Sequence, residues 1–178
     1  AVTRDPNVPE VWYVPAYYSN KEGHRKAKEG LMRSANGAYA LALAYRMTGE
    51  DKYGAAASRV VMAWAGLKKT RKQADSTLSF SYHFPPMIFA ADLLRGSKHL
   101  TADQDKTFQA FLRNKALPLN TMRRKNNWGN WGLTLYSAIG AYLGDKEMIA
   151  QAVKRWKEFI DTQIDEDGVM HHEVKRNG

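Results

Sequence analysis

The sequence predicts an all-α fold of stacked antiparallel helical hairpins. Apolar residues recur at helical spacing over several long segments, and no segment shows the apolar–polar alternation of a strand. A weak internal repeat supports the same fold. Gly49 and Gly144 each follow an Ala-Tyr pair and precede a helical segment with one tryptophan, Trp64 or Trp156. Helix pairs that recur along a chain are typical of a solenoid or of part of a helical toroid.

The composition is that of one globular domain with a basic balance of charge. The chain has 178 residues, of which 44% are hydrophobic, so it is long enough to fill a core and too apolar to be disordered. No apolar run approaches the roughly 20 residues that span a bilayer, so we expect no membrane partner. The formal net charge of +9 favours a polyanion. Without cysteine, disulfides and thiolate metal sites are excluded.

Residues 1–29 are predicted to form an irregular, aromatic N-terminal arm. Three prolines interrupt this stretch, and proline is disfavoured in the interiors of helices and sheets. The aromatic side chains of the arm include Trp12, Tyr13, Tyr17 and Tyr18. Residues 30–178 are predicted to form the helical domain.

The first helices follow from spacing and from stop signals. Residues 31–47 are rich in Ala, Leu and Met and lead into Gly49, a typical residue after a helix C-terminus. A second helix is expected over residues 51–67, where apolar side chains recur on one face. The basic segment 68–76 interrupts the pattern. A further helix is expected over residues 85–94, because its two prolines are tolerated in a first turn.

Three more helices are expected in the second half. Thr101 and Gln104 have the spacing of a capping box, which opens a helix that ends before Pro118. Residues 128–143 are expected to form the next helix. Residues 145–164 carry an apolar stripe at helical spacing and form the last one.

The sharpest local signal is the sequence RRKNNWGNWG at residues 123–132. Asparagine and glycine are poor helix formers, so packing alone does not explain them. Asparagine amides are neutral donors suited to a carboxylate, and tryptophan rings stack on sugars or bases. The candidate binding residues of this stretch are Arg124, Asn126, Asn127, Trp128, Asn130 and Trp131. The alternative is a helix N-cap with two anchoring tryptophans.

Two stretches with histidine supply further candidates. His171 and His172 lie in the C-terminal tail, while Tyr82 and His83 precede a proline pair and are candidates for an acid, a base or a sugar contact. The alternatives are a solvated loop for the tail and a structural histidine at position 83. Adjacent histidines rarely bind one ion, so no metal is predicted. No phosphate-binding loop, nucleophile elbow or other cofactor motif is present, and no cofactor is predicted.

Four stretches resemble the alginate lyase family of polysaccharide lyases. They are residues 41–53 with Trp64 beyond them, residues 90–94, the Asn126-Asn127-Trp128 motif through Trp131, and residues 167–176. The fold of this family is an α/α toroid, so the resemblance implies stacked hairpins that form an incomplete toroid. A toroid of six or seven hairpins commonly needs about twice this length. We therefore expect the chain to be truncated at its C-terminus and to belong to a longer polypeptide.

The resemblance also implies a chemistry. The family cleaves uronic-acid polymers such as alginate by β-elimination, which needs groups that neutralise the C5 carboxylate, a base for the C5 proton and an acid for O4. Asn127 matches the family's carboxylate-binding asparagine, and Arg176, with Lys175 beside it, falls on the family's arginine. Trp128 stands where the family has a histidine. The base is therefore open among His83, His171 and His172, with Tyr82 as the candidate proton donor.

The expected partner is an anionic polysaccharide, with Trp128, Trp131, Tyr17 and Tyr18 as stacking faces. Such a polymer implies a periplasmic or extracellular location. Two alternatives stay open. The basic clusters at residues 68–72 and 123–125 suit a helical nucleic-acid-binding module, the weaker choice. A non-catalytic carbohydrate-binding scaffold is the other, because Trp128 replaces a histidine.

Overall fold

The computed structural model describes residues 6–174 and confirms the all-α prediction. The helices are α1 (Lys21–Thr48), α2 (Asp51–Ala65), α3 (Ser76–His83), α4 (Pro85–Leu94), α5 (Ala102–Phe111), α6 (Asn127–Leu143), α7 (Lys146–Gln163) and α8 (His171–Val174). A π-helical turn (Leu112–Ala116) and a 3-10 turn (Leu117–Leu119) follow α5. The strands are β1 (Val11–Trp12) and β2 (Lys69–Thr70), which pair in parallel.

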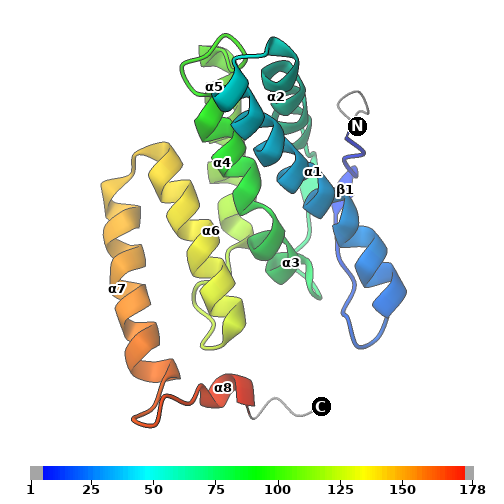
Figure 1. Ribbon diagram of the computed structural model, residues 1–178. Coiled ribbons are helices and arrows are strands. Elements are labelled where there is room, and N and C mark those ends of the chain that lie inside the picture. Colours follow the sequence, from blue (N-terminus) through cyan, green and yellow to red (C-terminus); the bar gives the residue numbers. More distant parts are fainter. Residues whose placement is uncertain (1–5, 175–178) are drawn as a thin grey trace.

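The helices alternate in direction and form three hairpins side by side (Figure 1). The hairpins are α1 with α2, α3 and α4 with α5, and α6 with α7. Within this arc α1 packs against α4, α4 packs against α6, and α2 packs against α5. The part of the chain described by the structure does not close into a ring.

Glycine turns join the first and last hairpins as the internal repeat predicts. Gly49 follows α1 with φ +71°, and Gly144 follows α6 with φ +65°. This left-handed conformation is costly for residues with a Cβ atom and free for glycine. The capping box at Thr101 is also confirmed, since its side chain and that of Gln104 each bond the other's backbone N–H.

The N-terminal arm is shorter and more ordered than the sequence suggests. Helix α1 begins at Lys21, because the Asn20 side chain accepts a hydrogen bond from the Gly23 N–H at 2.8 Å and caps the helix. The expectation that residues 21–29 are irregular is therefore wrong. Residues 1–5 lie outside the described part of the chain.

Helix α3 is an element that the sequence prediction missed. Its eight residues fill most of the gap between the basic segment and the proline pair, and Phe84 joins it to α4. Phe84 is fully buried and contacts the rings of Phe80, Phe108 and Phe111. This aromatic packing fixes α3 to the main core, so the residues at its end are held firmly in place.

Helix α7 forms the edge of the arc and packs mainly against α6 (Figure 1). One side of α7 and the residue that follows it carry a stripe of exposed apolar residues: Ile149, Val153, Trp156, Ile160 and Ile164. These side chains line an apolar groove of about 820 Å³ between α6 and α7. None of the helices within residues 6–174 has the length and apolar character needed to cross a membrane.

Candidate active site

The candidate site begins at the N-terminal end of α6. Asn126 caps this helix, because its side-chain oxygen accepts a hydrogen bond from the Trp128 N–H at 3.2 Å. The backbone N–H of Asn127 donates to Glu173 Oε1 at 2.7 Å. The C-terminal segment with α8 is therefore tied to the residue predicted to bind the carboxylate. Glu173 was not among the predicted site residues, and no local signal points to a contact over 46 positions.

Close packing explains the glycines of this segment. A Cβ atom at Gly129 would collide with the Arg124 carbonyl oxygen, and one at Gly132 would collide with the Met122 backbone nitrogen. Arg155 of α7 holds the same loop, since its Nε donates to the Met122 carbonyl at 3.1 Å. The glycines thus allow the basic loop to lie directly against the start of α6.

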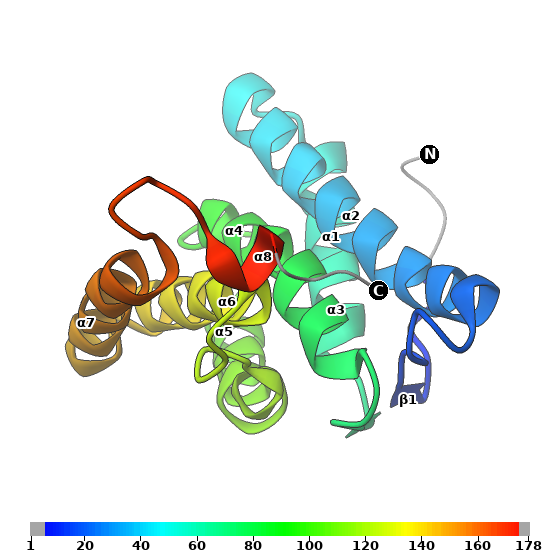
Figure 2. The same cartoon turned by 90° about the horizontal axis from the view of Figure 1, so that it is seen from below.

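Helices α3 and α6 bring three predicted site residues together. Trp131 lies one helical turn after Asn127, on the same side of α6. Its ring centroid is 4.2 Å from that of Tyr82 on α3, and the Tyr82 ring is 4.4 Å from that of His83. Seen from below, α3 lies beside α6 at this end of the molecule (Figure 2). Tyr82 and Trp131 remain 44% and 37% exposed, which leaves their rings accessible to a ligand.

His83 has an apolar and electropositive environment. Its Nε2 atom is buried and has no hydrogen-bond partner within the described residues. Burial, together with the nearby positive charges of Lys28 and His24, lowers the pKa of the His83 imidazole to about 4. The imidazole is therefore neutral near pH 7, the form in which a histidine accepts a proton.

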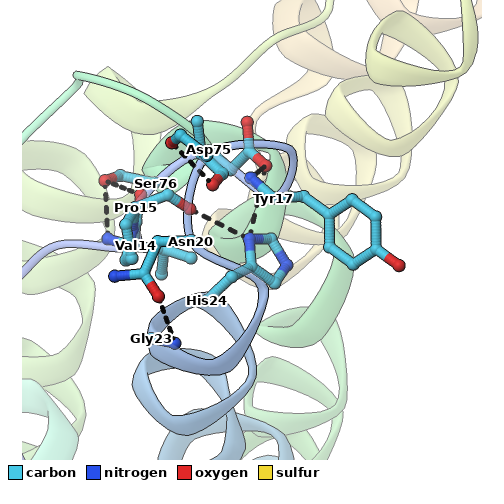
Figure 3. A network of polar contacts seen from close by, with 10 residues as sticks. Val14, Pro15, Tyr17, Asn20, Gly23, His24, Asp75 and Ser76 are labelled. Atoms are coloured by element: carbon cyan, nitrogen blue, oxygen red, sulfur yellow. Dashed lines mark hydrogen bonds and ion pairs between the residues drawn. The ribbon is translucent and has the colours of Figure 1, made fainter. Parts of the chain in front are cut away.

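Tyr17 and Tyr18 belong to residues 13–20, here called the strap. Hydrogen bonds join the strap to the first turn of α1 and to the start of α3 (Figure 3). The Tyr17 N–H donates to Asp75 Oδ2 at 2.9 Å. His24 Nδ1 lies 3.0 Å from the Pro15 carbonyl oxygen and 3.3 Å from Asp75 Oδ2. The sequence prediction missed His24 and Asp75, because only the tertiary fold brings positions 51 residues apart into contact.

The other predicted residues point elsewhere or fall outside the description. Trp128 packs against the Arg124 guanidinium, 5.4 Å from its ring, and the Asn130 amide donates to Gln163 Oε1 of α7 at 3.0 Å. His171 is exposed and forms an ion pair with Asp165. The His172 side chain, Lys175 and Arg176 lie outside the described residues. Within residues 6–174 no group of three His, Asp or Glu side chains is placed to hold a metal ion.

Helical hairpins that present asparagine, tyrosine, histidine and tryptophan at one end suit a carbohydrate-active enzyme. The model of the alginate lyase family matches residues 3–178, and the chain belongs to this family. It is accordingly a polysaccharide lyase. A comparison with curated proteins finds no match.

Proposed function

We propose that the protein cleaves a uronic-acid polysaccharide such as alginate by β-elimination at the α3–α6 end. The observation that carries this proposal is the cluster of Tyr82, His83 and Trp131, of which Trp131 lies one turn of α6 from Asn127. It combines exposed rings for stacking on sugars with an amide donor and a neutral imidazole. These are groups that an elimination next to a carboxylate requires.

The reaction follows from the acidity of the C5 proton. Asn127, with Arg176, binds the C6 carboxylate and stabilises the negative charge that develops on it. A base removes the C5 proton, the electron pair passes into an enediolate, and the C4–O4 bond breaks as the C4–C5 double bond forms. Tyr82 donates a proton to O4. His83, His171 and His172 are the candidate bases, and the ring of the buried, neutral His83 lies 4.4 Å from that of Tyr82.

The surface charge supports an acidic polymer as the substrate. The formal net charge of +9 draws polyanions to the protein, and exposed aromatic rings recognise sugar faces. A polymer too large to enter a cell must be cut outside the cytoplasm, so the proposal includes a periplasmic or extracellular location.

The apolar stripe of α7 supports the expectation of a longer polypeptide that completes a toroid. A helix that exposes Val153, Trp156 and Ile160 along one side resembles an inner helix whose neighbour is missing. Further hairpins stacked on α7 would cover this stripe and extend the arc of Figure 1.

One observation favours a second candidate, a nucleic-acid-binding module. Lys72 from one basic cluster and Arg123 and Arg124 from the other line a single cavity of about 560 Å³. Such a module would bind DNA or RNA with an affinity that falls steeply with salt, whatever the state of Asn127.

An absorbance assay for the unsaturated product, run over a panel of polyuronates, tests the proposal. We expect Asn127→Ala to lower kcat by about 100-fold or more with the fold intact by circular dichroism. Asn114→Ala, at an exposed position of the π-helical turn, is the matched control and should keep full activity. Wild-type protein that releases no product from any polyuronate contradicts the proposal. Saccharide binding without product favours the scaffold, and salt-sensitive nucleic-acid binding favours the rival module.

A further inference from the structure

The basic side chains in the N-terminal half of α1 differ in whether they form ion pairs. Lys26 pairs with Glu22 at 2.6 Å, and Arg33 pairs with Glu29 at 2.6 Å. Lys21 and Lys28 form no ion pair with any residue of the range 6–174. Lys21 and Lys28 therefore differ from Lys26 and Arg33 on the same helix, because no carboxylate of the described residues neutralises their charge.

The unpaired lysines lie on one side of α1 together with His24. Positions 21, 24 and 28 are three and four residues apart, so their side chains share one face of the helix. This face lies next to α3, since the charges of Lys28 and His24 act on His83. Lys21 lies in the first turn of α1, where its positive charge opposes the helix dipole. Helix stability therefore does not explain a lysine at this position.

The strap adds an aromatic surface to this face. The Tyr17 ring is 45% exposed, contacts the Tyr18 ring at 5.4 Å between centroids, and lies 5.6 Å from Lys21 Nζ. The Tyr17 ring also packs edge-to-face with the His24 ring, at 5.5 Å between centroids. An open ring next to an ammonium group matches a uronic acid, which offers an apolar sugar face and a carboxylate.

Polar contacts of Asp75 and His24 hold the aromatic surface in place (Figure 3). His24 Nδ1 bridges the Pro15 carbonyl oxygen and Asp75, and Asp75 also accepts the Tyr17 N–H. Through these contacts Asp75 Oδ2 is occupied by the Tyr17 N–H and the His24 ring. Tyr17 is thereby fixed next to Lys21 at little further cost in entropy when a ligand binds.

We propose that Lys21, Lys28 and Tyr17 form a second uronate-binding subsite, separate from the Asn127 end of the site. Helix α3 lies between α6 and the start of α1 (Figure 2). The Tyr82–Trp131 pair joins α3 to α6, whereas the Tyr17–Tyr18 pair belongs to the strap, which is bonded to Asp75 just before α3. In this proposal the subsite binds a further sugar of an oligouronate whose chain crosses α3, and it rests on the proposed function for the identity of the polymer.

The test compares binding and turnover of a uronate hexamer and of the shortest uronate oligomer that is cleaved. We expect Lys21→Met and Tyr17→Ala each to raise Kd and KM for the hexamer about tenfold, with kcat and the short oligomer little affected. Lys26→Met removes the same charge from the same helix and should leave both unchanged. A neutral hexasaccharide of similar length should bind weakly to every variant.

Each result decides the proposal. Unchanged hexamer affinity in Lys21→Met and Tyr17→Ala overturns the subsite, and so does an equal loss in Lys26→Met, which would indicate a diffuse charge effect. Product release with unaltered hexamer binding leaves the lyase function standing without the subsite. Weakened hexamer binding in a protein that releases no product leaves the subsite standing without the lyase function. A wild-type protein that does not bind the hexamer overturns it outright.

Discussion

The main hydrophobic core and the hairpin of α6 and α7 differ in how much apolar surface they bury. The main core draws mainly on α1 to α6 and on the segment around β1, and includes fully buried rings such as Trp12, Trp64 and Phe84. The cluster between α6 and α7 consists of Leu133, Ala152 and Phe159 with a few half-buried neighbours. The candidate site lies where these regions meet, since α3 belongs to the first and the start of α6 joins both.

This difference separates stability from assembly. Burial of apolar surface stabilises a fold in proportion to the area removed from water. The main core therefore supplies most of the stability, and it holds α3 and the strap rigidly. The apolar stripe of α7 contributes little to the stability of the fold while it faces solvent. It would add to stability only if another surface covered it.

The largest effect is expected from Phe84→Ala. This change removes a fully buried ring between Phe80, Phe108 and Phe111, and should lower the free energy of unfolding by about 3–5 kcal/mol. Urea denaturation followed by circular dichroism measures it. A loss below 1 kcal/mol would show that the core readily repacks around this position.

An intermediate effect is expected from acid acting on His83. Its pKa of about 4 in the folded protein lies below the ordinary value of 6.5, so the unfolded chain binds a proton first as the pH falls. Stability from this group is complete above pH 6.5 and is lost between pH 6.5 and 4. We expect the wild type to lose about 1–3 kcal/mol more than His83→Gln between pH 7 and pH 4.5. If the free energy of unfolding of the two proteins fell equally with pH, the lowered pKa of His83 would be contradicted.

The smallest effect is expected from Trp156→Ser on α7. This ring is 55% exposed, so its loss should change the free energy of unfolding by less than about 1 kcal/mol. In a longer polypeptide that covers the stripe, the same substitution should cost several times more. Equal, small effects in both proteins would count against a hairpin stacked on this side of α7.

The sequence predicts the helices best where local signals are strong. Gly49 and Gly144 are followed by helices as expected, and Thr101 opens α5 through its capping box. The prediction fails at the first third of α1, where Gly23 and Gly30 lower the helix propensity. Packing of Leu31 and the alanines that follow against the core extends the helix back across both glycines.

The candidate site shows the same division. Asn127 and Trp131 are candidates from the sequence because unusual residues stand together at the start of a helix, and Tyr82 and His83 because they precede a proline pair. Glu173 and Asp75 are not found, because their partners lie 46 and 51 positions away. Contacts over such separations depend on how the hairpins stack, which no local pattern records.

The sequence by itself therefore determined the helical class, most helix boundaries, the basic charge and the resemblance to a lyase family. These properties follow from spacing, capping and composition, which act over a few residues at a time. Tertiary structure alone decided that α3 brings Tyr82 against Trp131, and that the strap sets Tyr17 beside Lys21. Both arrangements arise because burial of the aromatic core fixes distant segments together, which is a property of the whole chain.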